Sequence, residues 1–122
     1  MKQYQMGAIE SRFADIIWEH EPLSSAELAR RSEELLSWKK TTSYTVLRRL
    51  CDKGLFVNEK GTVTSLVSKA EYISHQSEQF LNDTFEGSLP AFLAAFTAGK
   101  RLTEEEVAYL RRMVAEYEES AV

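Results

Sequence analysis

The stretch that decides the fold is residues 38–56, WKKTTSYTVLRRLCDKGLF. On a helix with about 100° per residue, its apolar side chains fall into one narrow seam. The members of this seam are Val46, Leu47 and Leu50, together with the small Ser43. Gly54 follows directly, as expected of a residue that ends a helix in the left-handed conformation. The spacing therefore predicts a helix over residues 39–53 with one face toward a core.

The opposite face of this predicted helix carries short hydroxyl groups and cations. On it lie Thr41, Thr42, Thr45, Arg48, Arg49 and Asp52, which is the single carboxylate of the stretch. Lys39, Lys40 and Lys53, toward the two ends of the helix, complete the set of residues expected at DNA. Threonine can approach base edges and thymine methyl groups, while arginine and lysine reach guanine edges or phosphates. The pattern indicates a DNA-binding surface, and the alternative is an ordinary solvated helix face.

The elements around this helix predict a winged helix-turn-helix. Apolar residues recur at helical spacing over 7–20, and a serine cap at Ser24 begins a second helix that runs to about residue 34. Residues 55–67 are β-branched on both sides of a Lys60-Gly61 turn, which predicts an antiparallel hairpin, the wing. Lys60 would lie near a flanking phosphate, or it would only keep an exposed turn soluble.

Residues 68–122 predict three helices with more apolar surface than so short a segment can bury. The apolar side chains assigned to the buried faces are Tyr72, Phe80, Phe85, Phe92, Phe96, Val107, Leu110, Met113 and Val114. Because soluble proteins seldom expose a large apolar patch, we expect this half to pair with a second copy in a two-fold dimer. The alternative is that these helices fold back onto the N-terminal half.

The net charge of −4 hides an uneven distribution. Residues 1–67 hold ten Lys and Arg against nine Asp and Glu, whereas residues 68–122 hold five against ten. Because local charge governs contact with phosphate, the first half suits nucleic acid and the second suits protein.

Motifs for catalysis or metal binding are missing from the sequence. There is no glycine-rich phosphate loop and no metal-ligand spacing, and His20 and His75 stand apart in polar surroundings. Cys51 is the single cysteine; it suits a half-buried core edge, or an oxidant sensor if Arg48 or Lys53 stabilised its thiolate. We expect no enzymatic activity, no metal and no cofactor. With no apolar run of about 20 residues and no signal-peptide pattern in residues 1–7, we expect a cytoplasmic protein.

In order and spacing, the chain resembles the BlaI/MecI/CopY family of bacterial repressors over nearly its whole length. The resemblance rests on Ile16-Ile17-Trp18-Glu19, Ser25-Ala26-Glu27-Leu28, Trp38, Thr42, Thr45, Arg49-Leu50, Lys53-Gly54, Leu66-Val67-Ser68, Glu71-Tyr72, Leu102-Thr103, Glu105-Glu106 and Leu110. It implies a mainly α fold with a small β wing: a winged helix-turn-helix DNA-binding domain over 1–67 and a helical dimerisation domain over 68–122. It also implies a homodimer on a dyad-symmetric operator, with helix 39–53 in the major groove and Thr41, Thr42, Thr45 and Arg49 at the DNA.

The sequence departs from the family pattern at three places. Members that answer β-lactams are cleaved by a sensor protease at an Asn-Phe bond, and Ala95-Phe96 stands there in this chain. Copper-responsive members carry a C-terminal cysteine motif, which is absent here. The wing is short and lacks the usual basic and aromatic residues after its glycine. The resemblance thus suggests a sensor protease as partner, and the Ala95-Phe96 pair argues against it.

Two other functions remain open from the sequence. One is a ligand-sensing winged-helix regulator with an effector site among the aromatic residues of the C-terminal half. The other is a winged-helix protein-interaction module that does not bind DNA, which the acidic pI of about 5.3 keeps under consideration.

Overall fold

The computed structural model describes residues 4–121 of the 122-residue chain. The chain divides into two compact units, with the division after Gln79. The predicted domain boundary, after residue 67, lies just before a helix, Lys69–Phe85, that runs across this division. Each unit is described by itself.

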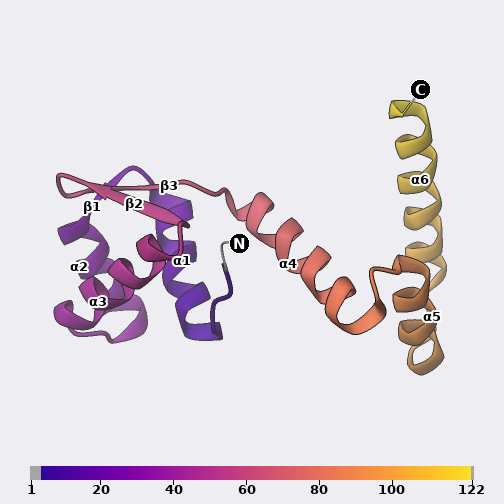
Figure 1. Ribbon diagram of the computed structural model, residues 1–122, viewed down its shortest axis with the longest axis horizontal. Helices are drawn as coiled ribbons and strands as arrows, with labels where there is room; N and C mark the ends of the chain where they lie inside the picture. The colour runs from indigo at the N-terminus through magenta and orange to yellow at the C-terminus, as the bar shows by residue number, and fades with distance from the viewer. Residues whose placement is uncertain (1–3, 122) are drawn as a thin grey trace. The chain divides into compact units, whose positions relative to one another are not determined.

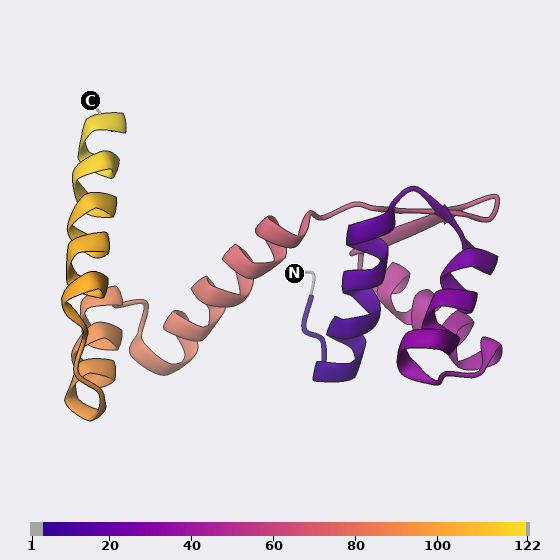
Figure 2. The same ribbon diagram turned by 180° about the vertical axis from the view of Figure 1, so that it is seen from behind.

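The N-terminal unit is built from helices on a small sheet (Figure 1; Figure 2 shows it from behind). Its elements are α1 (Ala8–His20), β1 (Leu23–Ser24), α2 (Ser25–Leu36), α3 (Lys40–Asp52), β2 (Phe56–Glu59), β3 (Thr62–Ser65) and the first part of α4 (Lys69–Phe85). The sheet is antiparallel with strand order β1-β3-β2, and Val63 of β3 lies between Leu23 and Asn58. The predicted wing is therefore confirmed.

The two strands of the wing are joined by a turn of only two residues. Lys60 and Gly61 both have positive φ, 52° and 84°, and they connect β2 directly to β3. Two central residues with positive φ match the right-handed twist of a hairpin. Glycine adopts this conformation without strain, whereas Lys60 is one of the few non-glycine residues that do so here.

The core of the N-terminal unit contains the predicted seam of α3. Ser43, Val46, Leu47 and Leu50 are all buried, and they pack with Phe13, Ile17, Leu28, Leu55, Phe56 and Val63. Trp18 closes one side, because its Nε1 donates to the Val67 carbonyl at 3.0 Å and its ring lies 5.3 Å from that of Phe56. This core holds α3 with its other face outward.

The C-terminal unit consists of the end of α4, α5 (Leu89–Gly99) and α6 (Glu104–Ser120). Side-chain oxygens of Ser88 and Thr103 accept from the backbone at the start of α5 and α6, and Thr103 and Glu106 form a capping box. No described residue of α4, α5 or α6 is buried. The molecule is thus mainly helical with a small β wing, as predicted.

Candidate nucleic-acid interface

The turn between α2 and α3 is short and firmly anchored. Ser37 ends α2 in the left-handed conformation, with φ 58°, and its N–H donates to the Glu33 carbonyl at 3.1 Å. The next residue, Trp38, stacks on the buried Phe13 ring with 5.2 Å between ring centroids. This anchor fixes the point at which α3 begins, and so the direction in which its outer face points.

The outer face of α3 carries the residues that the sequence singles out. Lys39, Lys40, Thr41, Thr42, Thr45, Arg48 and Arg49 are all exposed. The Thr45 hydroxyl donates to the Thr41 carbonyl at 2.9 Å, within the helix. Because its single proton is used there, Thr45 presents a methyl group and acceptor lone pairs outward.

The N-terminus of α3 has neither a capping side chain nor a nearby carboxylate in its first turn. Its N-cap residue, Lys39, makes no side-chain capping hydrogen bond, and the first turn contains no acidic residue. Backbone N–H groups of a first helical turn have no intrahelical partner and favour anions. Lys40 adds a cation at the same end, with its Nζ 6.0 Å from the centre of the Tyr44 ring.

One flank of α3 faces the N-terminus of α1. Arg49 Nη1 lies 3.9 Å, and Lys53 Nζ 3.7 Å, from Oε2 of Glu10. Lys53 also donates to the Gln5 carbonyl at 2.7 Å and is half-buried. The structure therefore places Lys53 against the protein itself, whereas the sequence predicts a phosphate contact for it.

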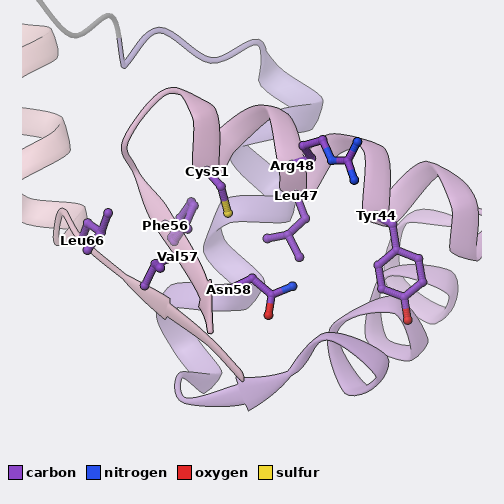
Figure 3. Close-up of a pocket in the computed structure, with 8 residues that line it drawn as sticks. All are labelled: Tyr44, Leu47, Arg48, Cys51, Phe56, Val57, Asn58 and Leu66. Atoms are coloured by element: carbon purple, nitrogen blue, oxygen red, sulfur yellow. The ribbon is translucent and has the colours of Figure 1, made fainter. Parts of the chain in front are cut away.

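The other flank of α3 faces β2 across a cavity of about 530 Å³. Figure 3 shows Leu47, Phe56 and Val57 in its apolar part, with Arg48 and Asn58 also at its wall. Cys51 lies in this cavity, and burial raises the pKa of its thiol, with the Asp52 carboxylate adding to the effect. A raised pKa favours the unreactive thiol form, so the environment argues against the oxidant-sensing thiolate.

The wing places Lys60 at the tip of the hairpin, where it is exposed. Its neighbour Glu59 is also exposed, so the tip carries both signs of charge. This position is compatible with either sequence interpretation of Lys60, the phosphate contact or the soluble turn.

The residues predicted for dimerisation divide between the two units. Tyr72 belongs to the N-terminal unit, where its ring lies 5.7 Å from that of Trp18. The others lie in the C-terminal unit, and all are exposed or half-buried: Phe80, Phe85, Phe92, Phe96, Val107, Leu110, Met113 and Val114. Phe80, Phe85 and Phe92 contact one another edge to face, with centroids 5.6 to 6.0 Å apart.

Sequence reasoning misses Glu10 and Gln5 as neighbours of α3. Both lie far from α3 along the chain, and Glu10 has a local role as well, because its Oε1 accepts from the Gly7 N–H at 3.5 Å. A capping residue of this kind gives no sequence signal of a second contact, which arises only when α1 and α3 pack on the same core.

The described part of the chain contains neither a metal-ligand cluster nor a membrane-spanning helix. Among residues 4–121, no group of three or more His, Cys, Asp or Glu side chains is placed to hold a metal ion. In the same part of the chain, none of the helices has the length and apolar character needed to cross a bilayer.

Comparisons with known proteins agree with this geometry. The chain is 27% identical over 117 residues to a penicillinase repressor of Bacillus licheniformis, covering 93% of this chain and 91% of that protein. It also resembles the solution structure of the DNA-binding domain of the repressor BlaI, with a TM-score of 0.53 and 25% identity over 59% of this chain and 94% of that one. The sequence model of the penicillinase repressor family matches residues 6–116. The chain therefore belongs to the penicillinase repressor family, a family of transcriptional repressors rather than of enzymes.

Proposed function

We propose that this repressor acts as a homodimer on a dyad-symmetric DNA operator, with α3 of each protomer in a major groove. Residues 1–67 would form the DNA-binding domain and residues 68–122 the dimerisation domain. The similarity to the BlaI DNA-binding domain supports the first assignment. The exposed apolar side chains of α5 and α6 support the second.

The observation that carries the DNA proposal is the unpaired positive charge on α3. None of the ion pairs within residues 4–121 involves Lys39, Lys40 or Arg48. All three side chains are exposed, and the helix N-terminus beside two of them has no capping side chain. Cations without internal partners are free to neutralise phosphates, and this neutralisation supplies nearly all of the sequence-independent affinity for DNA.

The threonines of the same face are suited to reading bases. Thr41, Thr42 and Thr45 are exposed between the cations. Because the Thr45 proton is used inside the helix, Thr45 would accept from an adenine or cytosine amino group, or contact a thymine methyl group. Phosphate contacts would come from Lys39, Lys40, Arg48 and Arg49, with Lys60 on the flanking backbone.

The dimer proposal rests on the apolar surface that the C-terminal unit leaves uncovered. Phe96 is 40%, Met113 52% and Val114 59% exposed. An apolar surface of this kind on a soluble protein usually marks an interface. A two-fold dimer would place two copies of α3 on half-sites about one helical turn of DNA apart, or a multiple of it.

The two other functions find less support. The phenylalanine rings proposed to receive an effector contact each other edge to face, which is the arrangement of a core. The Ala95-Phe96 pair lies inside α5, whereas proteolytic cleavage is favoured at exposed loop tips, so we propose no sensor-protease partner. The alternative of a protein-interaction module that does not bind DNA does not account for the unpaired cations of α3.

The direct test is selection of bound duplexes from a random pool by the full-length chain at two salt concentrations. We expect an inverted repeat to be enriched, to bind two chains, and to lose affinity steeply as salt increases. Enrichment of no sequence at either salt concentration would contradict operator binding. A complex with one chain per duplex would contradict the dimer.

A further inference from the structure

The Glu10 carboxylate lies beside two cations at the C-terminal end of α3. Its Oε2 atom is 3.9 Å from Arg49 Nη1 and 3.7 Å from Lys53 Nζ. The Glu10 side chain is only 20% exposed, and this oxygen has no hydrogen-bond partner among the described residues. One half-buried carboxylate oxygen thus faces two cations at ion-pair distance without being tied to either by a hydrogen bond.

The two cations differ in how free they are. Lys53 is 29% exposed and donates to the Gln5 carbonyl at 2.7 Å, so it is held in place. Arg49 is 54% exposed, and within residues 4–121 its one ion-pair partner is Glu10. Arg49 is therefore the group that can turn outward, and doing so separates it from the Glu10 carboxylate.

We propose that Glu10 is an intramolecular competitor for the operator phosphates, which lowers the affinity of the repressor for DNA through Arg49. A carboxylate near a cation reduces the positive potential that a phosphate meets. Binding of a cation to a DNA phosphate releases counterions from the DNA. A cation that is already paired with a carboxylate neutralises the phosphate less completely, so fewer counterions are released. Glu10 then limits DNA affinity without contacting DNA. This inference rests on the proposed function.

The test compares two neutralised acids of α1 in the full-length chain, Glu10→Gln and Asp15→Asn. Glutamine keeps the side-chain length and an oxygen that can accept from the Gly7 N–H. Asp15 is the matched control, because its carboxylate pairs with Lys69 at 2.9 Å and not with α3. Equilibrium binding to one random-sequence duplex is measured at several salt concentrations, with thermal unfolding of each variant as a check of folding.

We expect Glu10→Gln to bind about three- to tenfold more tightly at low salt and to steepen the slope of log affinity against log salt by up to about one. Asp15→Asn removes the same charge and should leave the slope unchanged. In an Arg49→Ala background, Glu10→Gln should give no gain. An equal gain in both acid variants, no gain, or weaker binding by Glu10→Gln would each overturn the proposal.

A second comparison does not depend on the folding of a Glu10 variant. Arg48 has no ion-pair partner within residues 4–121, whereas Arg49 is paired with Glu10. Arg48→Ala should therefore weaken binding to every duplex more than Arg49→Ala does, and an equal or larger loss for Arg49→Ala would overturn the proposal. If the unmodified chain binds no duplex in a salt-dependent way, the proposed function itself fails, which is a different result.

Discussion

The two units of this repressor differ in how completely they bury their apolar side chains. In the N-terminal unit, residues from α1, α2, α3 and all three strands meet in one core that includes the fully buried Phe13, Ile17, Leu50 and Phe56. In the C-terminal unit, no described residue is buried, although α5 is the most apolar helix of the chain. The N-terminal unit buries its apolar side chains in its own core, whereas the described residues of the C-terminal unit leave their apolar faces exposed.

This difference indicates which unit needs a second copy of the chain to cover its apolar surface. A segment as short as residues 80–122 seldom buries enough apolar surface by itself, and oligomerisation is one of the ways to make up the shortfall. The N-terminal unit has no such need. We therefore expect substitutions in the first unit to affect the folding of each chain, and substitutions in the second to affect the association of chains.

The largest effect should come from truncating a fully buried ring of the N-terminal unit. Phe13→Ala removes a side chain that packs in the core and stacks on Trp38. We expect a loss of about 3–5 kcal/mol in the free energy of unfolding of that unit, as for other large-to-small core changes. Chemical denaturation followed by circular dichroism would measure it.

Phe96→Ala is the matched change in the C-terminal unit. Phe96 is 40% exposed, so its truncation should weaken dimerisation, and a higher protein concentration should offset the loss. The contrast between the two units would be contradicted if a higher protein concentration also restored the stability lost in Phe13→Ala.

A smaller but clear effect is expected from a charge on the exposed apolar face of α6. Val114→Glu would place two carboxylates in the proposed interface, because both protomers carry the change, and unpaired charges are costly to bury. Dimerisation should weaken by about a hundredfold or more, measured by analytical ultracentrifugation. Glu116→Lys, which changes a charge on the opposite side of the same helix, should leave the dimer unchanged. A dimer that survives Val114→Glu would exclude this face.

A substitution on α3 should separate the affinity for the operator from the affinity for DNA of any sequence. Thr45→Ala removes a methyl group and the acceptor oxygen, while every cation stays in place. We expect the preference for the selected operator over a random duplex to fall by about tenfold, with random-duplex affinity nearly unchanged, since one good base contact is worth about 1–3 kcal/mol. Competition binding measures both values. Equal losses on the two duplexes would contradict the division between threonines and cations.

The smallest effect concerns the start of α6 and its pH dependence. The backbone N–H and the hydroxyl of Thr103, both in the capping box with Glu106, lower the pKa of that carboxyl. Because the folded-state pKa is below the unfolded one, the stabilisation is present above the unfolded value and is lost as pH falls through the folded value.

Glu106→Gln should therefore lower the melting temperature slightly at neutral pH, with the difference from the unmodified chain disappearing in acid. Glu104→Gln, in the same first turn but outside the capping box, is the control. A difference between the Glu106 variant and the unmodified chain that is constant from neutral to acid pH would contradict the capping account.

Local patterns predicted much of this fold. The seam of α3, the wing and the serine cap at Ser24 depend on residues close in sequence, and the structure confirms each of them. The outer face of α3 followed from the same periodicity.

Contacts between distant segments could not be predicted in this way. Tyr72 continues the apolar stripe of α4, so periodicity groups it with Phe80 and Phe85, but the structure packs it on Trp18. The division between units falls inside α4, a continuous helix without glycine or proline to mark it. From the sequence Lys53 is one more cation for DNA phosphates, but in the structure it contacts Gln5 and Glu10.

The central claim is that the second unit is completed by a second copy of the chain. The most direct measurement is thermal unfolding of the full-length chain over about a hundredfold range of protein concentration. If chains associate through α5 and α6, the melting temperature must rise with concentration, and the Val114→Glu variant must lose most of that rise. A melting temperature that is the same at every concentration would contradict the claim and would leave the exposed apolar faces without a function.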